Sequence, residues 1–210
     1  MATESNWFDS WLKDHLHRDI IFRIGVWTSI ASVTAYYASN ETGFSGVAYL
    51  DKASKSLLPV LNLIGSGAII LSLIAMMFKD AEQVDEKNWG ADSFLGRTGG
   101  FIRRLAGDLT LWVVGSLAAL LSAVTVALIQ AIRIGAMTTQ NASAIAIMYL
   151  LFGVFLVITA ILNVYVRRAK PPLTNSQPFS QLLTKPWRVL VVYSIAIGFM
   201  IYQAWPTHSG

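Results

Sequence analysis

Five apolar segments, each long enough to cross a lipid bilayer as a helix, limit the fold most strongly. They cover residues 20–38, 57–78, 109–134, 144–166 and 189–205. In lipid, every backbone N–H and C=O must be bonded within the segment, and the strict alternation of barrel strands is absent. Hydrophobic residues make up 54% of the chain and charged residues only 13%. The sequence therefore predicts an all-α, polytopic transmembrane bundle of about five spans, forming a single domain over residues 1–210.

The third segment carries a stripe of small residues. Residues 109–137 would span about 43 Å as a helix, more than the roughly 30 Å of a hydrocarbon core. A small residue at every fourth position lets another helix approach closely, so we expect a packing helix, either between subunits or inside the protomer. The stripe consists of Gly115, Ala119, Ala123, Ala127, Ala131 and Gly135.

Basic residues are divided very unevenly between the two sides of such a bundle. If the N-terminus is cytoplasmic, thirteen of the 16 lie in cytoplasmic segments, and three, Lys52, Lys55 and Arg133, lie on the far side. Such an excess marks the cytoplasmic loops of proteins in an inner or plasma membrane. We predict a cytoplasmic N-terminus, an outer C-terminus and five crossings. Four crossings result if the first segment, the least apolar, lies in the interface.

Residues 1–19 alternate apolar and polar side chains at helical spacing. The pattern predicts a short amphipathic helix on the cytoplasmic membrane face, acting as an interfacial anchor or as a docking helix for a partner. His15 and His17 do not predict a metal site, because residues two apart on a helix point away from each other. The apolar positions are Trp7, Phe8, Trp11, Leu12 and Leu16.

The longest predicted loop, residues 79–108, lies on the cytoplasmic side. Its four leading acids, Asp80, Glu82, Asp85 and Glu86, are interpreted as a solvated surface or a partner contact. Its glycine-rich part, residues 96–100, is interpreted as a flexible turn, or as a cradle for anionic lipid headgroups or a soluble phosphate. Phe101, Ile102 and Leu105 suggest a second interfacial helix. The arginines that would contact the anion are Arg97, Arg103 and Arg104.

Three amides lie within the apolar segments: Asn62, Gln130 and Asn163. A polar residue inside a span forms either a hydrogen bond between helices or part of a permeation or ligand site. Hydroxyl groups accompany these amides and would hydrate a pathway without charge. The candidate lining of a pore is Asn62, Ser66, Ser116, Ser122, Thr125 and Gln130.

The chemistry of most membrane enzymes and transporters is missing. There is no cysteine, and the histidines, His15, His17 and His208, lie outside the apolar segments, so a bis-histidine haem inside the bilayer is excluded. None of the five apolar segments has a carboxylate in its interior, as ion-coupled transporters generally do. The sequence predicts no catalytic residue, no metal, no cofactor and no nucleic-acid partner.

What remains is a non-catalytic membrane subunit that oligomerises, or that anchors a larger membrane-associated complex. The expected partners are the lipid bilayer with its anionic headgroups, and further copies or other membrane and cytoplasmic proteins. The alternative is a passive channel or pore made by several copies. A small transporter or a membrane enzyme is the weakest reading of the same residues.

Overall fold

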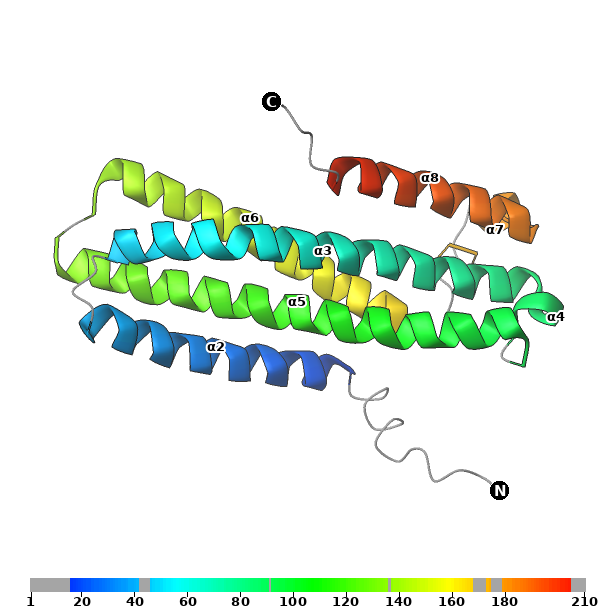
Figure 1. The fold of residues 1–210 in the computed structure, drawn as a ribbon, viewed down its shortest axis with the longest axis horizontal. Coiled ribbons are helices and arrows are strands. Elements are labelled where there is room, and N and C mark those ends of the chain that lie inside the picture. Colours follow the sequence, from blue (N-terminus) through cyan, green and yellow to red (C-terminus); the bar gives the residue numbers. More distant parts are fainter. Residues whose placement is uncertain are drawn as a thin grey trace, which may run out of the picture. The chain divides into compact units, whose positions relative to one another are not determined.

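The fold is all-helical in the computed structural model, which describes residues 16–41, 46–90, 92–135, 137–167, 173–174 and 179–204. The prediction of an all-α chain is confirmed (Figure 1). The amphipathic helix predicted within residues 1–19 lies mostly outside the described residues. The helices are α2 (Leu16–Glu41), α3 (Gly46–Val84), α4 (Glu86–Trp89), α5 (Phe94–Arg133), α6 (Thr139–Arg167), α7 (Phe179–Leu182) and α8 (Pro186–Ala204).

Among the described residues, four helical segments are long and apolar enough to cross a membrane. They are Asn62–Val84 in α3, Phe94–Arg133 in α5, Ala142–Arg167 in α6 and Pro186–Gln203 in α8. The first predicted span, residues 20–38, lies within α2 and is not among the four. The chain therefore has the character of a helical membrane protein.

The predicted loop 79–108 is largely helical, which corrects the sequence-based boundaries. The helix α3 continues to Val84, α4 follows after one residue, and α5 begins at Phe94. At the start of α5, the Ser93 hydroxyl accepts a hydrogen bond from the Gly96 N–H at 2.9 Å, as an N-cap does. At the other end, Gly135 has φ +67°, the left-handed conformation that commonly follows a helix.

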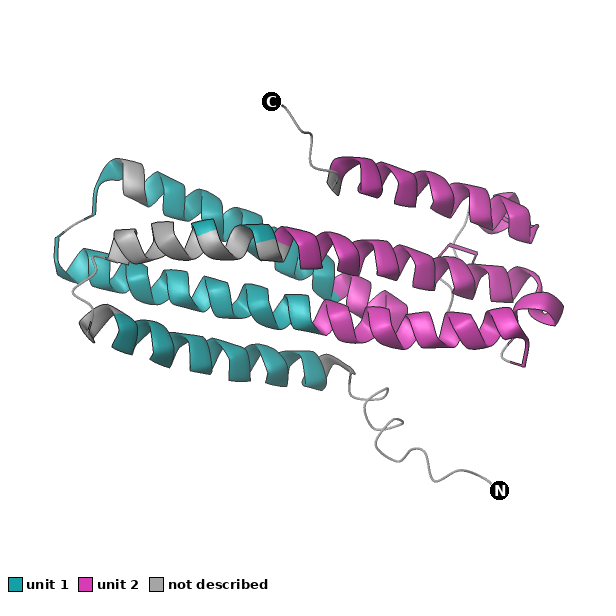
Figure 2. Ribbon diagram, viewed as in Figure 1, with its two compact units in different colours: residues 1–61, 112–160 teal, residues 62–111, 161–210 magenta. Residues whose placement is uncertain are grey.

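The chain forms two compact units, and α3, α5 and α6 contribute residues to both (Figure 2). Unit 1 comprises residues 1–61 and 112–160. Within it, α2 runs parallel to α5, since Trp27 of α2 contacts Trp112 and Ser32 contacts Ser122 further along (Figure 1). A second contact joins α5 to α6 through buried Val124, Ala127 and Ile145.

Unit 2 comprises residues 62–111 and 161–210. Its core joins α3, α5, α6 and α8 with the residues that follow α7. Small alanines on α3 and α5 face larger side chains, so these helices pack closely. The buried members of this core are Ala75, Met76, Ala81, Ala106, Val166, Leu183, Val189 and Tyr193.

Candidate functional site

Asp80 is the centre of a buried polar cluster in unit 2. Its side chain is fully buried and accepts hydrogen bonds from the Tyr193 hydroxyl at 2.6 Å, the Thr174 hydroxyl at 2.7 Å and the Thr174 N–H at 2.9 Å. The N–H of Leu173 lies 3.2 Å from the same carboxylate. These bonds tie α3 to α8 and to the connection after α6. The interpretation of Asp80 as a solvated acid is therefore wrong, because four protein donors replace its water.

Neighbouring charges of unit 2 are also engaged within the protein. The ammonium of Lys79, itself buried, donates to the backbone oxygen of Tyr165 at 3.1 Å. Glu82 of α3 forms an ion pair with Arg103 of α5 at 3.3 Å. Asp85 caps α4 by accepting a hydrogen bond from the Asn88 N–H at 3.3 Å. Of the four predicted surface acids, Glu86 is exposed.

A second ion pair joins α5 to α6 in the same unit. Arg167 of α6 lies 3.2 Å from Asp108 of α5. A Cβ added to Gly107 would lie 3.1 Å from Arg167 Nε, so the glycine gives the guanidinium room beside α5. This pair and the Glu82 pair connect α3, α5 and α6, three of the four helices that the buried core joins.

Asn163 joins α6 to α5 by hydrogen bonds. Its amide nitrogen donates to the backbone oxygen of Gly107 and to the hydroxyl of Thr110, both at 2.7 Å. Its oxygen is buried, and none of the described residues is its partner. Asn62 is exposed and accepts a long hydrogen bond, 3.5 Å, from Ser66 one turn along α3. Gln130 is half-buried on α5.

The small-residue stripe of α5 packs partly inside unit 1. A Cβ added to Gly115 would lie 2.6 Å from the ring of Trp27, so α2 approaches α5 closely there. Ala127 and Ala131 are buried. Ala119 and Ala123 are half-buried, and Gly135 lies beyond the end of the helix. The stripe thus serves contacts within the protomer at Gly115 and Ala127.

The glycine-rich segment is helical, so its interpretation as a flexible turn is wrong. A Cβ on Gly96 would lie 1.9 Å from the Gly90 oxygen, and one on Gly99 would lie 2.6 Å from the Phe78 ring. These glycines let α5 pack against α4 and α3. Helical hydrogen bonds and the Ser93 cap occupy the backbone N–H groups that a phosphate cradle would need.

The three predicted anion-binding arginines do not share a face. Arg103 pairs with Glu82, whereas Arg97 and Arg104 are exposed. Arg103 follows Phe94 by nine residues, about two and a half helical turns. It therefore lies on the opposite side of α5 from Phe94, which is 77% exposed. Lipid contact for Arg97 and Arg104 stays a prediction. The exposed face of α5, a name we keep below, consists of Phe94, Arg97, Phe101, Arg104 and Leu105.

Two candidate pore-lining hydroxyls are engaged inside unit 1. Ser122 contacts the Ser32 hydroxyl and donates to the backbone oxygen of Thr28 at 2.9 Å. Thr125 is hydrogen-bonded to the Tyr149 hydroxyl. These bonds hold α2 and α6 against α5 and leave fewer free groups to line a pathway.

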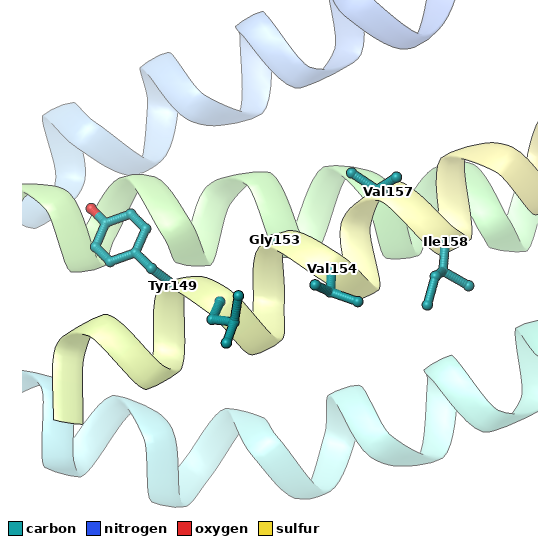
Figure 3. A pocket seen from close by; sticks show the side chains of 6 residues that line it. Tyr149, Gly153, Val154, Val157 and Ile158 are labelled. Atoms are coloured by element: carbon teal, nitrogen blue, oxygen red, sulfur yellow. The ribbon is translucent and has the colours of Figure 1, made fainter. Parts of the chain in front are cut away.

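An open apolar groove of about 390 Å³ lies on α6, around Gly153 (Figure 3). Val154, Val157 and Ile158 project beside it, and its remaining lining residues also belong to α6. Its chemistry suits a lipid acyl chain. In the part of the chain that the structure describes, no cluster of three histidines or carboxylates could hold a metal ion.

These features define an all-helical chain with four candidate membrane spans and an internally bonded polar cluster. No protein-family model, curated protein sequence or solved structure matches the chain. Its function must therefore be argued from its own residues.

Proposed function

We propose that the protein is a non-catalytic integral membrane subunit that oligomerises or anchors a larger membrane-associated assembly. The observation that carries this proposal is the continuation of α3 and α5 beyond their apolar segments. With 40 residues, α5 is about 60 Å long, roughly twice the thickness of a hydrocarbon core. The packing of Gly99 against Phe78 and the Glu82–Arg103 pair hold this extension to α3. It is a rigid support for a partner.

The polar cluster supports a structural role over a catalytic one. A general acid or nucleophile needs a free reacting atom within reach of a substrate. The carboxylate of Asp80 is fully buried and bonded to protein donors at both oxygens. Tyr193 is buried and donates a hydrogen bond from its hydroxyl to the same group. We infer that the cluster fixes the connection between α6 and α8.

The packing of α2 supports a fifth crossing. Its contacts with Trp112, Gly115 and Ser122 lie along the apolar part of α5, where an interfacial helix would not reach. Hydrogen bonds between Ser32, Ser122 and the Thr28 carbonyl are typical of helices that pack within lipid. In this arrangement α2 and α5 cross in the same direction. The N-terminus then lies on the cytoplasmic side with the start of α5, and the C-terminus lies outside.

Native mass spectrometry after extraction from native membranes in mild detergent tests the proposed function. We expect the chain at a multiple of its own mass, or bound to a different protein. A lone monomer in several mild detergents, and in native nanodiscs prepared without detergent, would overturn the proposal. Ion flux into liposomes containing the purified protein distinguishes this proposal from the alternative of a passive pore. A tight vesicle favours a subunit, and an ion leak favours a pore.

A further inference from the structure

The exposed face of α5 combines aromatic and basic side chains in an unusual position. Phe94 is 77% exposed and Phe101 67%, although both lie on a helix that packs tightly on its other side. Arg97 and Arg104 flank them, and no acid occurs between residues 94 and 105. The face is therefore apolar along its centre and positive along one edge.

This face extends beyond the lipid headgroups. Asp108 is 71% exposed, and no charged residue follows it before Arg133, so it marks the end of the hydrocarbon on this side. Phe94 lies about 21 Å along the axis from Asp108, and still about 16 Å above it at a tilt of about 40°. Headgroups occupy only about 5 to 7 Å on each side. A protein segment therefore covers the Phe94 end of this face better than lipid does.

We propose that the exposed face of α5 binds residues 1–15 of a second copy of the chain. Those residues carry Glu4, Asp9 and Asp14 against a single base, Lys13, which complements the two arginines of the face. Their apolar side chains have the helical spacing that suits a helix laid along an apolar stripe. As a helix, 15 residues measure about 22 Å, and the face from Phe94 to Leu105 measures about 17 Å.

Residues 1–15 and the exposed face of α5 are expected on the same side of the membrane. Because α2 runs parallel to α5, the chain before α2 emerges on the side where α5 begins. This inference rests on the proposed function, since it names the contact through which copies assemble. Binding between copies joins neighbouring subunits at their cytoplasmic ends.

Disulfide crosslinking between two differently tagged copies tests the proposal, and the chain itself contains no cysteine. One full-length copy carries Trp11→Cys, and the other carries Thr98→Cys, which lies between Phe94 and Phe101 on the face. Co-expressed in native membranes and oxidised, they form a disulfide only between copies. The matched control replaces Thr98→Cys by Lys87→Cys on α4, an exposed position at the same end but off the face.

We expect the crosslinked pair to be at least fivefold more abundant with Thr98→Cys than with Lys87→Cys. Its yield should fall when Arg97→Gln and Arg104→Gln are added to the copy that carries Thr98→Cys. Equal yields at both positions, or no crosslink, would overturn the proposal. No crosslink is the result expected if residues 1–15 bind the bilayer instead. Native mass spectrometry of the same chains distinguishes failure of this inference from failure of the proposed function. An oligomer without the crosslink leaves the proposed function standing, whereas a monomer removes both.

Discussion

Asp80 shows how a single acid organises one end of the helical bundle. A carboxylate has four acceptor positions, and here two backbone N–H groups and two hydroxyls use them. Hydrogen bonds to a charged acceptor are stronger than those between neutral groups. Leu173 and Thr174, which belong to no helix, are thereby held to α3 and α8.

Replacing Asp80 with alanine should destabilise the protein by on the order of 3 to 5 kcal/mol, because the buried N–H groups of Leu173 and Thr174 and the Tyr193 hydroxyl lose their acceptor. Unfolding of the protein in nanodiscs, followed by circular dichroism, measures this. A variant with parental stability would show that water replaces the carboxylate.

Tyr193→Phe removes one of these bonds and should cost about 1 to 2 kcal/mol. Tyr202→Phe, in the same helix at a side chain that is 74% exposed, is the matched control and should change stability little. The same unfolding measurement compares the two. Equal losses would place the effect in α8 as a whole instead of the bond to Asp80.

The sequence could not predict this cluster. Asp80 lies two residues after the end of an apolar segment and resembles any acid at the end of a span. Its partners Leu173, Thr174 and Tyr193 lie 93 to 113 positions away in the chain. Only the folded structure brings α3, α8 and the non-helical residues Leu173 and Thr174 together.

At the scale of the element, a glycine can mark a turn or a close contact between helices, and the sequence does not distinguish the two. Gly96 and Gly99 suggested a turn, yet they lie in α5, where they allow backbone and ring contacts that a Cβ would block. The helical state of the apolar segments was easier to predict, because a segment in lipid must bond its own backbone N–H and C=O groups. Each predicted span lies within one long helix, apart from its terminal residues.

Gly115→Leu should separate α2 from α5 and cost about 1 to 3 kcal/mol, because the new side chain would overlap the ring of Trp27. Gly153→Leu on α6 is the matched control, since a Cβ there meets nothing within 4 Å. Thermal unfolding in detergent measures both. If Gly115→Leu keeps the parental stability, the contact between α2 and α5 contributes little to the stability of the protein.

The stripe gives a graded prediction for leucine substitutions. Ala127 is only 3% exposed against Val124 and Ile145, so Ala127→Leu should unfold the monomer. Ala123 is half-buried and should accept leucine at a smaller cost. If Ala123→Leu leaves the monomer folded but disrupts the oligomer seen by native mass spectrometry, that part of the stripe lies between subunits.

At the scale of the whole molecule, the orientation of the chain depends on α2. Thirteen of the 16 basic residues fall on one side if all five long helices cross. The contacts of α2 with Gly115 and Ser122 place it beside the apolar part of α5. Two of its charged residues, Asp19 and Arg23, pair with each other at 3.0 Å near its N-terminal end, which lowers the cost of an Arg there.

A reporter fused after Gly210 should therefore be active outside, and one inserted near Asn88 should be active in the cytoplasm. An outer C-terminus with a cytoplasmic Asn88 requires an odd number of crossings between them, here α5, α6 and α8. A third reporter, fused before Met1, tests α2: it should be active in the cytoplasm if α2 crosses and outside if α2 does not. Insertion at Asn88 is the control, since this exposed site should be cytoplasmic whether or not α2 crosses. A cytoplasmic C-terminus together with a cytoplasmic Asn88 would mean that one of α5, α6 and α8 does not cross, which would contradict the five-span hypothesis. If the reporter before Met1 becomes active on both sides of the membrane with Gly115→Leu, but not with Gly153→Leu, packing against α5 holds α2 in the membrane.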